Sequence, residues 1–231
     1  MEITCTSDLH GHYPKLEGGD LLIVAGDCLA NDTLQARIDF FVWLQRQKYK
    51  ERIYIAGNHD NIFEKRSPTD APEGIYLCDS GTEFEGIRIW GSPWTLRFEG
   101  MNPNCMAFTC ETEEELAEKW ALIPHDTDIL VTHSPPKYGL DKTIWQDNVG
   151  SASLTDWVMD HQPKLHVFGH IHESYGKITD ATVRELSMEL FGNASNRLSN
   201  TTIVNASHVN ERYEPVNKPI RIELEVTRNE L

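Results

Sequence analysis

The 231-residue sequence lacks any apolar run close to the roughly 18 residues that a membrane-spanning helix needs. Its first residues, MEITCTSDLHGH, contain neither the basic region nor the apolar stretch of a signal peptide, so we expect a cytoplasmic protein. Its five cysteines are odd in number and form no CxxC pair, which excludes a regular disulfide framework and favours reduced thiols.

Basic residues are also scarce, because 21 Lys and Arg stand against 36 Asp and Glu for a net charge of -15. A strongly acidic surface repels long nucleic acids and anionic membranes, so we expect neither as a partner. A small anionic substrate stays compatible with this charge if a bound cation reverses the local field. The chain has no internal repeat or low-complexity linker, and we expect a single domain over residues 1–231.

One pattern recurs five times along the chain: a short apolar run is followed by a small residue and then by Asp, Asn or His. The five segments are ITCTSDLHGH (3–12), LLIVAGD (21–27), RIYIAGNHD (52–60), DILVTHSPP (128–136) and LHVFGHIH (165–172). Continuous apolar runs predict strands that are buried on both faces. Ligands of open α/β sheets gather beyond the carboxyl ends of the strands, so we expect these polar residues to converge.

Three segments between the runs have the apolar spacing of helices, and one has the pattern of a hairpin. The helical segments are 33–47 with Asp32 or Thr33 as N-cap, 111–123 with Thr109 or Thr112 near its start, and 153–162; the hairpin covers 80–92. The polar segment 179–200 is interpreted as a long excursion between two strands. The alternation of strands and helices predicts an α/β fold.

The residues that end the five runs have side chains suited to borderline divalent ions such as manganese, iron and zinc. They are Asp8, His10, Asp27, Asn58, His59, His133, His170 and His172. One ion needs about four ligands, so the set is too large for one ion and fits two. Asp27 carries two oxygens and is able to bridge ions about 3.5–4 Å apart. Any one of these residues alone is more commonly a cap or a loop residue; the joint occurrence favours metal.

Strand geometry adds an expectation, because residues two apart in an extended segment point to the same side. Asp8 with His10, and His170 with His172, would each project together if the strands continued that far. Glycines at 26, 57 and 169 allow close approach of the backbone.

Three neighbouring features stay open on the sequence alone. Asp60 either orients His59 or is a turn carboxylate, and His12 either contacts substrate or belongs to a loop. Residues 91–108 either line a substrate pocket or cover the core.

The blocks SDLHGH, AGD, AGNHD, THSPP and FGHIH resemble, in this order, the five sequence blocks of the calcineurin-like metallophosphoesterases. The resemblance runs from residue 3 to about residue 222. RIWGSPW, PKLHVFGHIHESYG and YEPVNKPI are similar to the metallophosphoesterase-domain-containing subgroup, which is related to class III cyclic nucleotide phosphodiesterases. The resemblance implies an α/β (α+β) fold: a four-layer αββα sandwich of two mixed β-sheets flanked by helices.

The resemblance also implies two metal sites, with manganese as the first expectation and iron or zinc as alternatives. One ion would be held by Asp8, His10, Asp27 and His172, and the other by Asp27, Asn58, His133 and His170. His59 would be the catalytic histidine beside the leaving group. Asn58 and His59 would contact the substrate, and His12 is a further candidate for such a contact from its place in SDLHGH alone.

The activity implied is hydrolysis of small phosphodiesters, cyclic nucleotides among them, by a hydroxide that bridges the two ions. Both histidines of the FGHIH block are present, which favours a working enzyme. After AGD the chain reads CLAND, without the phosphate-binding Arg of phosphoprotein phosphatases, which argues against that class. The alternatives are a phosphomonoesterase, or a metal- or nucleotide-binding scaffold with little turnover. The oligomeric state stays open.

Overall fold

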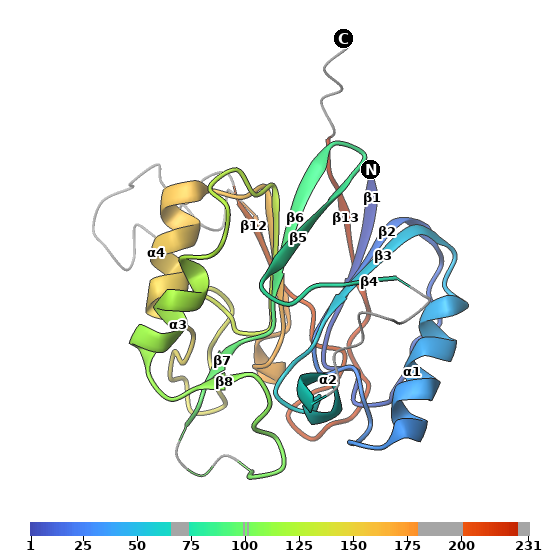
Figure 1. Cartoon of the computed structure of the whole chain (residues 1–231), viewed down its shortest axis with the longest axis horizontal. Helices are drawn as coiled ribbons and strands as arrows, with labels where there is room; N and C mark the ends of the chain where they lie inside the picture. Colours follow the sequence, from blue (N-terminus) through green and yellow to red (C-terminus); the bar gives the residue numbers. More distant parts are fainter. Residues whose placement is uncertain (66–73, 99, 101, 180–200, 226–231) are drawn as a thin grey trace.

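The computed structural model describes residues 1–65, 74–98, 100, 102–179 and 201–225. Two large mixed sheets pack face to face, with helices on the outer side of each (Figure 1). The predicted four-layer αββα sandwich is therefore confirmed. The excursion predicted at 179–200 lies, apart from its first residue, outside the described residues. Within the described part of the chain, no helix has the length and apolarity to span a membrane.

The first sheet has five strands, which are β13 (Ile220–Glu223), β1 (Glu2–Thr6), β2 (Gly19–Ala25), β3 (Tyr49–Ile55) and β4 (Ile75–Tyr76) in their spatial order. The strands β1 to β4 run parallel to one another, while β13 is antiparallel to β1. Three of the five apolar runs predicted as strands thus lie side by side in β1, β2 and β3.

The second sheet has six strands, with a parallel centre and antiparallel edges. In spatial order they are β11 (Gly176–Ile178), β12 (Thr202–Asn205), β10 (Leu165–Phe168), β9 (Ile129–Thr132), β6 (Ile87–Ser92) and β5 (Ser80–Phe84). The hairpin predicted at 80–92 is confirmed as β5–β6. Glu85 and Gly86 turn it with φ of 49° and 79°, the left-handed pair that matches strand twist. A short two-stranded sheet joins β7 (Thr95–Leu96) to β8 (Thr109–Cys110).

The helices cover the outer faces of the sheets, and the three predicted helices are confirmed. They are α1 (Leu34–Gln45, N-cap Thr33), α3 (Glu113–Trp120, N-cap Thr112) and α4 (Ala152–His161, N-cap Ser151), and the structure adds α2 (Asn61–Lys65) and the 3₁₀ turn η2 (His172–Ser174). Phe40 of α1 packs against the first sheet, while Trp120 of α3 and Leu154 of α4 pack beside Leu130 of the second. In each predicted helix a hydroxyl accepts a hydrogen bond from the first-turn backbone, which fixes where the helix begins.

The main core lies between the two sheets and explains why the strand sequences are apolar without alternation. In β2, Leu21 and Ile23 belong to the cluster that packs on Val131 and Val167 of the second sheet. The residue between them, Leu22, belongs instead to the cluster under α1. Each strand is therefore buried on both faces, as the sequence predicted.

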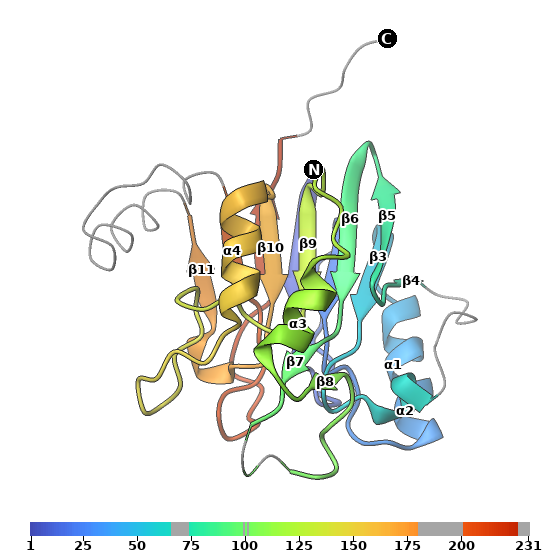
Figure 2. The same cartoon turned by 60° about the vertical axis from the view of Figure 1, so that its left-hand side comes forward.

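The carboxyl ends of the parallel strands of both sheets meet at one end of the molecule, the lower end in Figures 1 and 2. Backbone hydrogen bonds join them there: Ser7 N donates to Ala206 O at 2.9 Å, and Asp8 N donates to Gly26 O at 3.0 Å. Ala206 N also donates to Phe168 O at 2.8 Å, and Gly169 N donates to His133 O at 3.3 Å. The segments that follow β1, β2, β9, β10 and β12 are consequently held side by side. This end of the sandwich is where the sequence predicted the polar residues to gather.

Candidate metal centre

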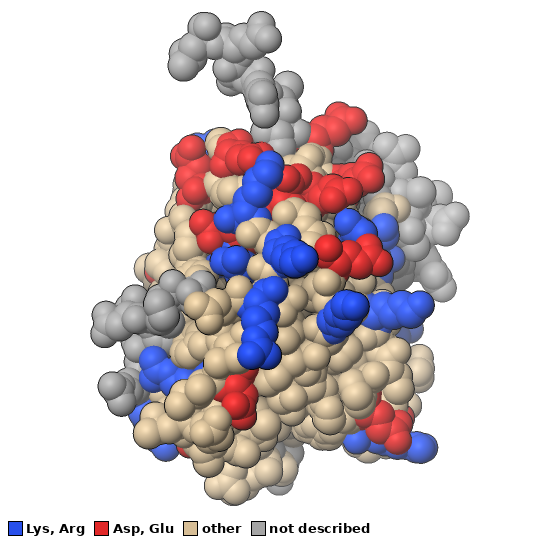
Figure 3. All heavy atoms as spheres, turned by 90° about the vertical axis from the view of Figure 1, so that its right-hand side faces the viewer, with Lys and Arg blue, Asp and Glu red and all other residues tan. Residues whose placement is uncertain are grey.

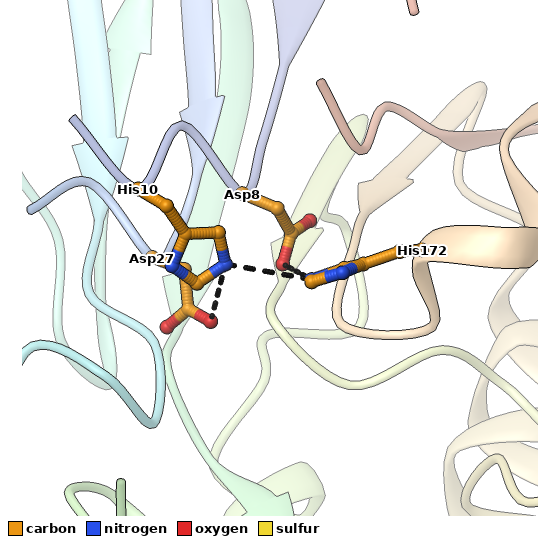
Figure 4. A group of neighbouring side chains, drawn as sticks. All are labelled: Asp8, His10, Asp27 and His172. Atoms are coloured by element: carbon orange, nitrogen blue, oxygen red, sulfur yellow. Dashed lines mark hydrogen bonds and ion pairs between the residues drawn. The ribbon is translucent and has the colours of Figure 1, made fainter. Parts of the chain in front are cut away.

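Four predicted ligands converge at this end of the sheets: Asp8 and His10 after β1, Asp27 after β2, and His172 in η2 (Figure 4). One potential ligand atom from each lies within 4.8 Å of those of all the others. His10 Nε2 is 3.4 Å from His172 Nε2 and 3.6 Å from Asp27 Oδ2. His172 Nε2 is 3.2 Å from Asp8 Oδ1. This is the spacing of side chains that share one cation.

A second group adjoins the first through Asp27. His133 Nε2 lies 3.4 Å from Asp27 Oδ2 and 3.0 Å from Asn58 Oδ1. The rings of His133 and His170 have centroids 5.0 Å apart. Asp27 Oδ2 therefore faces His10 on one side and His133 on the other. The structure brings together all seven predicted ligands, in two groups with one carboxylate between them.

The backbone reaches this arrangement by a route that the sequence reasoning did not expect. β1 ends at Thr6, so strand alternation does not pair Asp8 with His10. Instead Asp8, His10, Asp27 and His170 all have left-handed backbones, with φ of 49°, 41°, 50° and 70°. Non-glycine residues adopt this region rarely and at a cost of roughly 1–3 kcal/mol each, and such strain clusters at functional sites. The convergence was predicted correctly, but the extended geometry offered for it was wrong.

Hydrogen bonds fix which atoms of His133 and Asn58 face Asp27. His133 Nδ1 donates to Ala25 O at 3.0 Å, so in the neutral ring Nε2 carries a lone pair. Asn58 Nδ2 donates to Cys105 O at 3.0 Å, which leaves Oδ1 toward the histidine. Lone pairs of His133, Asn58 and Asp27 thus point at one another. They repel unless a proton or a metal cation lies between them, so this donor set fits a cation.

The same logic applies to His172 and Asp8. His172 Nδ1 donates to Asn210 O at 3.2 Å, so in the neutral ring Nε2 carries a lone pair that is able to bind a cation shared with Asp8. That carboxylate accepts hydrogen bonds from His170 N, at 3.1 Å to each oxygen, and from Ser207 Oγ at 2.8 Å. Such outer contacts hold ligands in place and set the histidine tautomer. Sequence reasoning missed Ser207 and Asn210, because neither residue type stands out as a ligand.

The charges of the two groups reinforce this arrangement. Burial opposes ionisation of Asp8 and Asp27, but the neighbouring histidines hold the pKa of both carboxyls below its ordinary range. Burial alone would lower the pKa of His133, yet Asp27 and Asp8 raise it to about 9. Burial lowers the pKa of His10 to about 4 and that of His170 to about 3. Burial opposes protonation of His172, but the charge of Asp8 raises its pKa. Protons on His133 and His172 would therefore compete with a cation, whereas the lowered pKa values of His10, His170 and the two carboxyls favour their ligating forms.

All three of the predicted glycine approaches are seen, and a Cβ at Gly26 would lie 2.5 Å from His133 Nδ1. A Cβ at Gly169 would collide with Asp8 Oδ2, and a Cβ at Gly57 would collide with Asp27 Oδ1. Only glycine admits the carboxylates this close to the backbone.

The sequence profile of the family described as calcineurin-like phosphoesterase matches residues 1–174. The chain belongs to the calcineurin-like phosphoesterase family. It is 36% identical to Metallophosphoesterase domain-containing protein 1 of Homo sapiens and of Mus musculus, over 97% of this chain and 71% of each relative. Both the superfamily and the subgroup resemblance are thereby confirmed. The solved structure of TT1561 of Thermus thermophilus shares the fold, with a TM-score of 0.54 and 17% identity over 88% of each chain. The protein is thus a metal-dependent phosphoesterase.

Asp60 of this phosphoesterase is a turn carboxylate, which is the second of the two roles that the sequence left open for it. It is fully buried, and its oxygens accept hydrogen bonds from Cys28 N, Leu29 N and Gly57 N at 3.0, 3.0 and 2.9 Å. These bonds join the loop that carries Asp27 to the loop after β3. Burial and the charge of Asp27 raise the pKa of Asp60 to about 8, against the three N–H donors.

Five further histidines fall into three places. His59 lines a cavity beside the ligands, with Nε2 4.0 Å from Asp27 Oδ2 and its side chain 25% exposed. His12 is exposed and is not among the residues that line this cavity, so its contact with substrate stays a prediction. His125 and His161 face each other at the surface, and the ring of buried His166 forms a hydrogen bond with Thr132 Oγ1.

The cavity next to the metal centre of the phosphoesterase has a volume of about 940 Å³. Phe98 and Cys105 line it, whereas Phe108 is in the core. The segment 91–108 therefore does both things that the sequence allowed: some of its residues line the cavity and others cover the core. Tyr213 also lines it, with its ring centroid 4.8 Å from that of His10. Sequence reasoning missed Tyr213 and the nearby Trp145, because isolated aromatic residues in loops carry no ligand signal.

Proposed function

We propose that this chain is a dinuclear metallophosphodiesterase that hydrolyses small phosphodiesters, cyclic nucleotides among them. The observation that carries the proposal is Asp27 Oδ2, which lies 3.6 Å from His10 Nε2 and 3.4 Å from His133 Nε2. A carboxylate between two groups of ligands is the arrangement that bridges two ions. The adjoining cavity of about 940 Å³ is much larger than a phosphate and leaves room for the organic groups of a diester.

In this proposal the first ion is held by one group and the second by the other, with Asp27 in common. The ligands of the first are Asp8, His10, Asp27 and His172, and those of the second are Asp27, Asn58, His133 and His170. Imidazole, carboxylate and amide oxygen suit manganese, with iron and zinc as the alternatives. Bound ions would activate a water molecule as the nucleophile and neutralise negative charge on the phosphoryl oxygens.

His59 is the proposed proton donor to the departing alkoxide. It lines the cavity, and its backbone N–H donates to Asp27 Oδ1 at 2.9 Å, which places the imidazole beside the shared carboxylate. Its ring centroid is 4.7 Å from that of His10, so it stands next to the ligands. General acids of this kind contribute roughly 10²–10⁴-fold to the rate. Asn58 and His59 are also the proposed contacts to the phosphate.

The preference for small substrates is supported by charge, although the surface is uneven. The net charge of -15 opposes long polyanions. Lys and Arg side chains nevertheless gather on the face of the molecule shown in Figure 3, on the side that carries α1. Arg46, the C-cap of α1, and Lys48, which follows it, are exposed. That face is a side of the sandwich and the candidate metal centre is at its end, so these cations do not line the cavity. The substrate's phosphate is therefore expected to bind through the metal ions.

The test is turnover of purified protein with Mn²⁺ on bis(4-nitrophenyl) phosphate, 4-nitrophenyl phosphate and cyclic nucleotides. We expect diester hydrolysis that EDTA abolishes, that Asp27→Ala removes, and that His125→Ala, a surface control, leaves unchanged. Faster hydrolysis of the monoester would favour a phosphomonoesterase instead. Tight binding of Mn²⁺ without turnover of any substrate would favour the scaffold.

A further inference from the structure

We propose that the cavity contains a subsite for one organic arm of the phosphodiester, in which Trp145 stacks on a planar, uncharged aromatic group. The inference rests on the proposed function and deepens it, because it names the class of arm that the same site accepts. Three segments build the subsite: the chain after β7, the loop of residues 143–150, and the loop of residues 211–213. All three lie at the lower end of the molecule in Figure 2.

The wall of the cavity is made of large apolar side chains that the fold leaves unpacked. Phe98, Ile144, Trp145, Val149 and Tyr213 are all exposed, and all line this one cavity. Scattered apolar residues on a surface are ordinary, but a group of them around a hollow marks a binding site. Because the metal ligands Asp27, His170 and His172 line the same cavity, a phosphate at the metal centre would place its arm against this wall.

Trp145 is the largest of these side chains, and it is 76% exposed although its loop is well braced. Thr143 N donates to Asp147 O at 3.0 Å, and Gln146 N donates back to Thr143 O at 2.9 Å. Ile144 N donates to Glu173 Oε1 at 2.9 Å, which ties the tip of the loop to η2. The indole therefore lies on a hydrogen-bonded turn. Among the residues that the structure describes, no aromatic ring or cation stacks on either of its faces. A fixed, open indole suits stacking of a planar group.

Charge decides what kind of planar group fits. Away from the ligands and His59, the charged residues that line the cavity are Glu113, Asp147, Glu173 and Glu211 against Lys137 alone. This excess of negative charge disfavours an arm that carries a carboxylate or a second phosphate. The expected substrate has a single negative charge, on its diester phosphate, and a neutral aromatic arm.

Matched phosphonates separate the arm from the phosphate and need no turnover. We would measure binding of phenylphosphonate and methylphosphonate to the Mn²⁺-loaded protein by calorimetry. Wild type should bind phenylphosphonate about tenfold more tightly, a typical gain from one aromatic stack. Trp145→Ala should reduce this ratio to near one and leave methylphosphonate binding unchanged, while Trp145→Phe should retain most of it. Tyr138→Ala is the control, because Tyr138 is exposed but does not line the cavity.

A charged arm gives an independent readout. 4-Carboxyphenylphosphonate should bind wild type more weakly than phenylphosphonate does. Asp147→Asn removes one negative charge from the cavity wall, so it should reduce the difference in affinity between these two compounds. Equal binding of the phenyl and methyl compounds to wild type, or an undiminished ratio in Trp145→Ala, would overturn the subsite while leaving the proposed phosphodiesterase intact. Failure of both phosphonates to bind the Mn²⁺-loaded protein would overturn the proposed function and this inference with it.

Discussion

Replacing Asp60 tests how the fold holds the loops that carry the proposed ligands. Its carboxylate accepts hydrogen bonds from Cys28 N and Leu29 N, directly after Asp27, and from Gly57 N, directly before Asn58. Asp60 is fully buried, so bulk solvent does not compete for these hydrogen bonds in the folded protein. Asp60→Ala would leave three buried N–H groups without their acceptor.

The magnitude follows from those three donors. A buried N–H left unsatisfied costs roughly 1–3 kcal/mol, and water that enters the space left by the side chain recovers part of it. We therefore expect Asp60→Ala to lower the free energy of unfolding by about 3–5 kcal/mol. Asp60→Asn keeps an oxygen but turns its NH₂ toward one of the donors, so we expect a loss of about 1–2 kcal/mol. Displaced loops should also weaken Mn²⁺ binding by about 10–100-fold.

Urea unfolding in EDTA measures the stability change, and calorimetry on the folded variants measures Mn²⁺ binding. Asp156→Ala is the matched control, because Asp156 is exposed on α4 and its loss should stay within about 0.5 kcal/mol. An Asp60→Ala protein as stable as that control, with wild-type affinity for Mn²⁺, would refute the role assigned to Asp60.

Three further predictions follow from the site. Burial raises the pKa of Asp60 to about 8 in the folded protein from an ordinary value of 3.8, so its stabilising contribution is fully present below about pH 4 and is lost as the pH rises through about 8. In EDTA, the free energy of unfolding of wild type relative to that of Asp60→Asn should therefore fall between these two pH values. A difference in free energy that does not change with pH would contradict this prediction. Ser207→Ala removes a hydrogen bond to Asp8 Oδ2 and should weaken Mn²⁺ binding about tenfold, as measured by calorimetry; wild-type affinity in this variant would show that the bond does not hold Asp8 in place. His59→Ala should lower kcat by about 10²–10⁴-fold for diesters with alkyl leaving groups and by much less for nitrophenyl esters; equal losses in steady-state assays would argue against an acid role.

The sequence predicted the strands and their polar ends because these depend on local pattern. The apolar runs needed no alternation, since residues such as Leu21 and Leu22 face two different clusters. The helices at 33–47 and 111–123 began at Thr33 and Thr112, where a hydroxyl cap is readable from sequence. The Ser151 cap of α4 was missed, although its residue type gave the same signal.

The detailed geometry of the site was not predictable, because long-range contacts impose it. Asp8 and His10 are left-handed, and their backbone N–H groups donate to Gly26 O and Asp27 O, both at 3.0 Å. Asp and His are enriched among the few non-glycine residues that adopt this region, but the preference is too weak to indicate such a turn from sequence, and the extended geometry expected for these residues was wrong. Trp145 was missed for a related reason. Its proposed role in binding depends on which cavity its loop borders, and only the tertiary structure determines that.

The central claim is that two cations share Asp27 at the carboxyl ends of the two sheets. Crystals grown with Mn²⁺ and measured for anomalous scattering test it directly. The claim predicts two peaks about 3.5–4 Å apart, one among Asp8, His10 and His172 and the other among Asn58, His133 and His170, with Asp27 contacting both. A single peak in saturating Mn²⁺, or peaks away from Asp27, would contradict it.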